Sequence, residues 1–179
     1  LRMPYSDIHI STFHTFCQRL LEQYGLEIGL PNQFKLITET DAWLLIREHI
    51  YEFDLKYFRP LGNPTRHIHE FLKHFSKCKD EIISPEEYLK HVESLTFEDV
   101  EEQERLSELA HAYQKYNQLL LEKGYLDFAD LIYYCVKLFR ERPNVLKRIQ
   151  NQYKYILVDE FQDVNYAQYL LTQLLSQSG

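Results

Sequence analysis

The sequence predicts a mainly helical fold, in which a helical insertion is carried by a larger α/β domain that this chain holds only in part. About a hundred residues in the middle of the chain place apolar side chains at helical spacing. Strand-like stretches lie only near the two ends, at residues 8–10 and 155–158. Because two isolated strands cannot make a stable sheet, we expect the rest of the sheet to lie outside this sequence.

The N-terminal third predicts three helices. The first begins at Thr12 and ends at Gly25, and the second begins near Thr40. Asn63 followed by Pro64 is typical of an N-cap and a first-turn proline, so the third helix is expected to begin there. The inward faces of these helices are marked by Phe16, Leu20, Leu21, Tyr24; Ala42, Leu45, Ile46, Ile50, Phe53; and Ile68, Phe71, Leu72, Phe75.

Three further helices are indicated by their ends. Ser84 and Glu87 have the spacing of a capping box. Residues 98–123 form a long helix with an acidic first turn, which Gly124 closes. Asp127 caps the next helix, whose apolar face we assign to Phe128, Leu131, Ile132, Cys135 and Phe139.

The pattern changes after Pro143, which is expected to break that helix. Residues 155–158 form a compact apolar run of the kind that is buried in a parallel sheet. Asp159 and Glu160 follow directly, and helical spacing returns after Asn165. The acidic pair is therefore expected at the carboxyl end of a strand, where ligands bind in open α/β sheets.

Composition narrows the class of protein. Of 179 residues, 45% are hydrophobic and only 5 are glycine, which predicts a folded chain without linkers. No apolar run is long enough to span a membrane and no signal peptide opens the chain, so we expect a cytoplasmic protein without a membrane partner.

The three cysteines lie far apart and are expected to be reduced. The first residue, Leu1, and the helical ending suggest a fragment.

Adjacent carboxylates at the carboxyl end of a strand, as expected for Asp159 and Glu160, have two uses in phosphoryl transfer. One can hold Mg²⁺, while the other orients or deprotonates the attacking water. The alternative is an acidic pair exposed in a turn, as we expect for Glu86 with Glu87. The residues by themselves leave both interpretations open.

Three segments resemble motifs of the UvrD/Rep-like superfamily 1 DNA helicases. Residues 156–165, ILVDEFQDVN, resemble the Walker B motif of that family. Residues 11–17, STFHTFC, resemble its Thr-Phe-His segment, and residues 126–131, LDFADL, are similar to its Asp-Phe-x-Asp-Leu segment. The resemblance covers essentially the whole chain and implies part of a RecA-like P-loop NTPase domain, called 1A, at residues 1–25 and 127–179. Residues 26–126 would be its inserted helical domain, called 1B.

The resemblance also implies roles for four acidic-segment residues. Asp159 would hold the Mg²⁺ of bound ATP, and Glu160 would be the general base for hydrolysis. Gln162 and Asp163 resemble residues that relay the nucleotide state. For Asp127 and Asp130, which match the Asp-Phe-x-Asp-Leu segment, we favour helix capping.

DNA contacts are implied in two places. Thr12 and His14 match family positions that touch single-stranded DNA. Arg66, Lys73 and Lys77 would fall on one side of the third helix and could face a duplex junction, although ordinary surface lysines are an equal alternative. The net charge of −7 argues against a general nucleic-acid binder.

Departures from the family pattern limit what the chain can do alone. It contains no G-x-x-x-x-G-K-[ST] loop to cradle phosphates, so we expect it to be inactive without the rest of the helicase chain. A helicase-nuclease subunit of the same family remains an alternative, as does a non-catalytic helical interaction module. His74 and Cys78 have the spacing of zinc ligands, but with one cysteine nearby we expect no zinc site.

Overall fold

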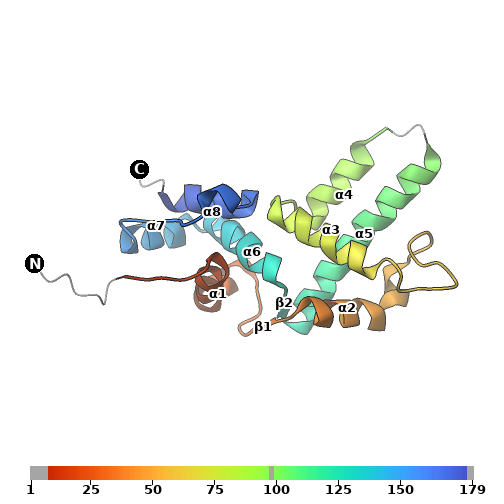
Figure 1. Cartoon of the computed structure of the whole chain (residues 1–179), viewed down its shortest axis with the longest axis horizontal. Helices are drawn as coiled ribbons and strands as arrows, with labels where there is room; N and C mark the ends of the chain where they lie inside the picture. Colours follow the sequence, from red (N-terminus) through yellow and green to blue (C-terminus); the bar gives the residue numbers. More distant parts are fainter. Residues whose placement is uncertain (1–7, 97–98, 177–179) are drawn as a thin grey trace, which may run out of the picture.

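The computed structural model describes residues 8–96 and 99–176, and arranges them as two groups of helices side by side (Figure 1). One group holds α1, α6, α7 and α8, and the other holds α2, α3, α4 and α5. The mainly helical fold is therefore confirmed. The α-helices are α1 Phe13–Tyr24, α2 Glu39–Glu48, α3 Ile68–Asp80, α4 Pro85–Ser94, α5 Val100–Lys123, α6 Phe128–Glu141, α7 Pro143–Gln152 and α8 Tyr166–Ser176. Short 3₁₀ turns are η2 Gly25–Ile28, η3 Ile50–Phe53 and η4 Phe161–Asp163.

Helix ends follow the predicted capping residues in four places. The Thr12 side chain accepts a hydrogen bond from the backbone N–H of Thr15 at 3.2 Å and starts α1. Ser84 and Asp127 each form a reciprocal capping box at the start of α4 and α6. Gly124 ends α5 with φ of 68°, a left-handed conformation that glycine adopts without steric cost.

Each group of helices has its own hydrophobic core. The first core is built mainly from α1, α6, α7 and α8, and the second from α2, α3 and α5. In the second core, the Phe75 ring stacks on the rings of Tyr113 and Tyr116 with centroids 5.1 and 5.4 Å apart. Along the chain, the packing changes from the first core to the second between Leu36 and Ile37.

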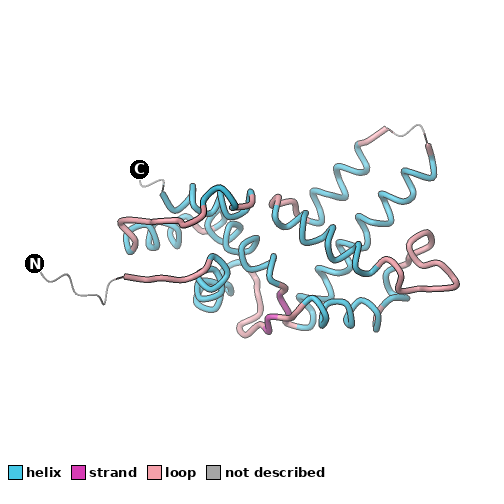
Figure 2. Tube along the Cα trace, in the orientation of Figure 1, coloured by secondary structure: helices cyan, strands magenta, loops and turns pink. Residues whose placement is uncertain are grey.

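Two short parallel strands lie where the chain crosses between the groups (Figure 2). They are β1 Lys35–Leu36 and β2 Tyr125–Leu126, and Lys35 pairs with Tyr125 while Leu36 pairs with Leu126. Neither strand is predictable from the sequence, because two residues are too few to show an alternating pattern.

The strand predicted at residues 155–158 is not formed within the described residues. The segment is extended but pairs with no strand of the described residues, and the side chains of Tyr155 and Leu157 are 91% and 98% exposed. The stretch at residues 8–10 is also unpaired and exposed. A strand exists only through hydrogen bonds to a neighbour, so an apolar run without one stays an open segment.

Helix boundaries differ from the prediction in two places. The helix α3 begins at Ile68 and not at Asn63, whose carbonyl instead accepts the turn hydrogen bond of Arg66. The helix α7 was missed, since Pro143 was interpreted only as the end of α6. Pro143 in fact occupies the first turn of α7, where its missing N–H costs nothing. No helix of the described residues has the length and apolar character needed to cross a membrane.

Candidate functional site

The acidic segment forms a tight, exposed turn after residues 155–158. Glu160 has φ of 48°, a left-handed conformation that is uncommon for a residue with a side chain. Its backbone N–H donates to Asp159 Oδ1 at 3.0 Å, and its carboxylate accepts a hydrogen bond from the Gln162 amide. The turn η4 then leads through Asp163 towards α8. Both residues of the predicted pair are exposed.

The carboxylates of Asp159 and Glu160 are free of positive charge in the part of the chain that the structure describes. None of its ion pairs involves either residue. Nor do three metal-ligating side chains come together within residues 8–96 and 99–176. Mg²⁺ is commonly held by one or two carboxylates together with water and substrate phosphates, so an exposed and unpaired Asp159 suits that donor set.

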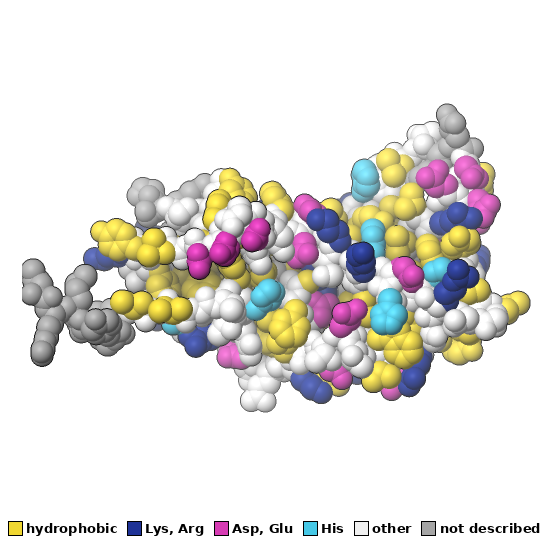
Figure 3. Space-filling view, viewed as in Figure 1, with side chains coloured by type: hydrophobic (Ala, Val, Ile, Leu, Met, Phe, Trp, Pro, Cys, Tyr) yellow, Lys and Arg dark blue, Asp and Glu magenta, His cyan; other side chains and the backbone are white. Residues whose placement is uncertain are grey.

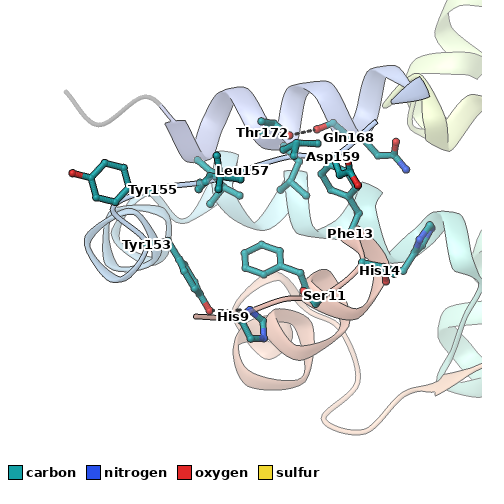
Figure 4. Close-up of a pocket in the computed structure, with 16 residues that line it drawn as sticks. His9, Ser11, Phe13, His14, Tyr153, Tyr155, Leu157, Asp159, Gln168 and Thr172 are labelled. Atoms are coloured by element: carbon teal, nitrogen blue, oxygen red, sulfur yellow. Dashed lines mark hydrogen bonds between the residues drawn. The ribbon is translucent and has the colours of Figure 1, made fainter. Parts of the chain in front are cut away.

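A cavity of about 450 Å³ lies beside the acidic segment (Figure 4). Asp159 lines it at the same end as Phe13 and His14, while Tyr155 lies at the opposite end. Thr12 also lines this cavity, but its hydroxyl is occupied as the cap of α1. The structure therefore brings together one predicted nucleotide ligand and both residues of the predicted DNA contact in the N-terminal segment.

A second cavity, of about 750 Å³, lies between α2, α3 and the start of α6. Lys73 and Lys77 line it from α3, and Phe128 lines it from α6. Phe128 was predicted to be part of the core face of its helix, but its side chain is 52% exposed. In the first turn of α6, Asp130 is buried against α3, whereas Phe128 faces the second cavity and stays half exposed. An aromatic residue directly after an N-cap was the signal that could have indicated this.

His14 connects the two cavities. It lines the first, and its ring lies edge-on to the Phe128 ring with centroids 5.9 Å apart. Burial lowers the pKa of His14, and the nearby Asp80 carboxylate opposes that effect only in part. The imidazole is therefore neutral at pH 7, where it can stack or hydrogen-bond but adds no charge.

The predicted basic side chains differ in their surroundings. Arg66 is exposed but lies in the turn before α3, so the three residues do not share one helix face as expected. The Lys77 Nζ pairs with Glu81 Oε1 at 2.7 Å, and that carboxylate raises the pKa of Lys77. Lys73 is exposed and has no ion pair within the described ranges. Figure 3 shows basic side chains over α3, with acidic and histidine side chains around them.

A buried ionic cluster stands behind the second cavity. Lys79 lies on the same helix as Lys73 and Lys77, but its side chain is only 1% exposed. Its Nζ lies 2.6 Å from Asp127 Oδ2 and 2.7 Å from Asp130 Oδ1, the two residues of the α6 capping box. The Tyr116 hydroxyl donates to Asp127 Oδ2 at 3.0 Å. Capping of α6 is thus confirmed, and the same carboxylates also bind a lysine of α3.

The cluster shares one cation between two acids. Burial pushes the pKa of Lys79 down, but Asp127 and Asp130 outweigh it, so the pKa lies above its usual value. Burial raises the pKa of Asp130 to about 7, and the Asp127 charge adds to the effect. For Asp127, burial is outweighed by Lys79 and its pKa is lowered. Of the two acids, Asp130 is therefore the one that holds a proton more tightly.

Some predicted residues are not brought to either cavity. Glu160, Gln162 and Asp163 lie in the exposed turn outside both, and Arg66 lies before α3. His74 Nε2 and Cys78 Sγ are 3.6 Å apart, but they gather no third ligand in the described part of the chain. Burial raises the pKa of Cys78 to about 11, which disfavours the thiolate that zinc needs.

Comparison with known proteins identifies the family. The model of the UvrD/REP helicase N-terminal domain matches residues 1–179, the whole chain. The chain belongs to the UvrD/REP helicase family. It is 35% identical over 173 residues to the ATP-dependent DNA helicase PcrA of Bacillus subtilis, covering 96% of this chain and 21% of that protein. DNA helicase II of Rickettsia typhi is 32% identical over 174 residues, with coverage of 94% and 24%.

A third relative, DNA helicase II of Haemophilus influenzae, is 32% identical over 169 residues, with coverage of 93% and 21%. The chain therefore spans about a fifth to a quarter of the length of these curated relatives. Membership in the family accounts for the resemblance of the acidic segment, the Thr-Phe-His segment and the Asp-Phe-x-Asp-Leu segment.

Proposed function

We propose that this chain is part of the motor of an ATP-dependent DNA helicase. Residues 1–25 and 127–179 would belong to the RecA-like domain 1A, and residues 26–126 to the helical domain 1B. The two separate cores support this division, although the chain passes from the first core to the second after Leu36 and not after residue 25. In the longer protein, ATP hydrolysis would drive translocation on single-stranded DNA and unwinding of the duplex.

The observation that carries the proposal is the acidic pair in its turn. Asp159 and Glu160 follow an unpaired apolar segment, are exposed, and take part in no ion pair of the described residues. In the longer protein, strands pairing with residues 155–158 would place both carboxylates at the edge of a sheet, where nucleotides bind. Asp159 would hold the Mg²⁺ that neutralises phosphate charge, and Glu160 would accept the proton of the attacking water.

Gln162 and Asp163 would report the state of the nucleotide. The Gln162 amide already donates to the Glu160 carboxylate, so a change at Glu160 can reach η4 directly. Asp163 starts the connection to α8 and would contribute to the same nucleotide site. The isolated chain would hydrolyse nothing, because its sequence contains no phosphate-binding loop.

The DNA would contact the second cavity and its rim. The Phe128 ring is half exposed and meets the His14 ring edge-on. Lys73 lines the same cavity and forms no ion pair in the described residues. Single strands bind proteins by stacking bases on such rings while lysines contact the phosphates. Thr12 would act mainly by setting the start of α1, while Lys77 and Arg66 would contribute charge at the duplex side.

The test is ATP turnover by the longer parent protein with and without single-stranded DNA. Glu160→Gln should lower turnover by about a hundredfold or more, because only the base is lost, and nucleotide affinity should stay nearly the same. Glu102→Gln, in an exposed acidic pair of α5, is the matched control and should change nothing. Unchanged turnover in Glu160→Gln would remove Glu160 from this role. A parent without DNA-dependent turnover would favour the non-catalytic interaction module.

A further inference from the structure

The C-terminal end of α3 connects the two groups of helices through consecutive residues. Lys79 binds the α6 capping box, as described above. The next residue, Asp80, accepts a hydrogen bond from the Asn165 amide, with Asp80 Oδ1 and Asn165 Nδ2 2.8 Å apart. Asn165 lies between η4 and α8. One end of α3 is therefore bonded both to the helix that carries Phe128 and to the segment that follows the acidic turn.

Asn165 uses the rest of its polar groups to hold the start of α8. Its Oδ1 accepts from the backbone N–H of Gln168 at 2.9 Å, and the Gln168 side chain accepts from the Asn165 N–H at 3.1 Å. This reciprocal cap fixes the Asn165 side chain in one orientation. A displacement of Asp80 is consequently passed to the backbone between Asp163 and α8 rather than absorbed by a loose side chain.

The end of α3 is itself held in an unfavourable backbone conformation. Ile82 has φ of 56°, which is exceptional for a β-branched residue. The N–H of Ile83 bonds the carbonyl of Cys78 at 2.9 Å, and the N–H of Ile82 bonds that of Lys79 at 3.0 Å, a Schellman ending in which glycine is usual. Ile82 packs against the first core, although α3 belongs to the second. Such strain persists only where the surroundings define the position closely.

Charged or titratable side chains from several elements surround Asp80. Burial raises the pKa of Asp80, and the Glu81 and Asp127 carboxylates raise it further, whereas Lys77 lowers it. His14 faces Asp80 from α1. Asp80 therefore lies among side chains of α1, α3 and α6 and bonds to Asn165 in front of α8.

We propose that the Asp80–Asn165 hydrogen bond is a positioning contact that couples DNA binding at α3 to the acidic segment. The inference rests on the proposed function. Lys73 lies on α3 about two turns before Asp80 and Lys77 about one turn before it, and a helix of this length moves as one unit. When DNA shifts α3 relative to α6 and α8, Asp80 moves Asn165, and the turn that carries Asp159 and Glu160 follows.

The test uses the longer parent protein and exchanges the two side chains. Asn165→Asp keeps an acceptor that caps α8 but places a second carboxylate against Asp80. The ratio of ATP turnover with a saturating single-stranded oligonucleotide to turnover without DNA should fall by about tenfold. Basal turnover should stay within about twofold of wild type. Asp80→Asn keeps an acceptor for the Asn165 amide and is the matched control, with a nearly normal ratio.

The double variant Asp80→Asn with Asn165→Asp decides the question. Its amide donates to the carboxylate in the reverse direction, so the stimulation ratio should return to within about twofold of wild type. A normal ratio in Asn165→Asp alone would overturn the proposal. So would a double variant that stays defective, since the loss would then come from the α8 cap. A wild-type parent whose turnover ignores DNA would instead overturn the proposed function.

Discussion

Removal of the Lys79 charge should destabilise the chain more than any surface substitution. In Lys79→Met the side chain keeps its length but leaves Asp127 and Asp130 facing each other without a cation. Because Lys79 is 1% exposed, water cannot replace its ammonium group. Breaking a buried pair by removing one partner costs about 3–5 kcal/mol, a large share of the 5–15 kcal/mol that is typical of a domain.

The pH dependence of that loss follows from the remaining acids. Asp130 already has its pKa raised to about 7, chiefly by burial, so it is protonated at about pH 5 and contributes little repulsion there. At about pH 8 both carboxylates would be charged, or one would have to take up a proton at a cost. The loss of stability in Lys79→Met should therefore be larger at about pH 8 than at about pH 5.

Urea unfolding of the 179-residue chain, followed by far-UV circular dichroism at both pH values, measures this loss. The matched control is Lys77→Met on the same helix, whose side chain is 68% exposed and pairs with Glu81. It should cost less than about 1 kcal/mol. A loss below about 1 kcal/mol in Lys79→Met, or one that is independent of pH, would refute the assignment of a buried ionic cluster.

Three further outcomes are expected. The free energy of unfolding of wild type minus that of Asp130→Asn should fall as the pH rises from about 4 to about 7. The reason is that the folded chain holds a proton at Asp130 that the unfolded chain has released. Urea titrations at a series of pH values measure this difference, and a rise with pH would contradict the raised pKa of Asp130. In the longer parent, Lys73→Ala should lower the salt dependence of DNA binding by about one phosphate contact and Lys77→Ala by less, because Lys77 is paired with Glu81; equal slopes in fluorescence anisotropy would contradict this difference. Phe128→Ala should weaken single-strand binding by about 1–3 kcal/mol with an unchanged salt slope, whereas Tyr51→Ala, at another exposed aromatic ring, should have no effect.

The sequence predicted helix ends well where the signal is local. Thr12, Ser84 and Asp127 cap helices because their side-chain oxygens reach a backbone N–H three residues ahead, and Gly124 ends a helix through its own φ. The same locality misled the prediction at Pro143, which can end one helix and begin another. Local chemistry allows Pro143 to do either. A helix begins there because residues of α7 pack against the first core.

Family membership and the mainly helical class followed from the sequence alone, since residue order and apolar spacing carry both. Only the tertiary structure decided that residues 155–158 are unpaired, that Phe128 faces outward and that Lys79 is buried. Lys79 and Asp127 are 48 residues apart, and Asp80 and Asn165 are 85 residues apart. A paired strand, a cavity wall or a buried ion pair depends on residues that are distant in the chain. A local sequence pattern does not specify which distant residue becomes the partner.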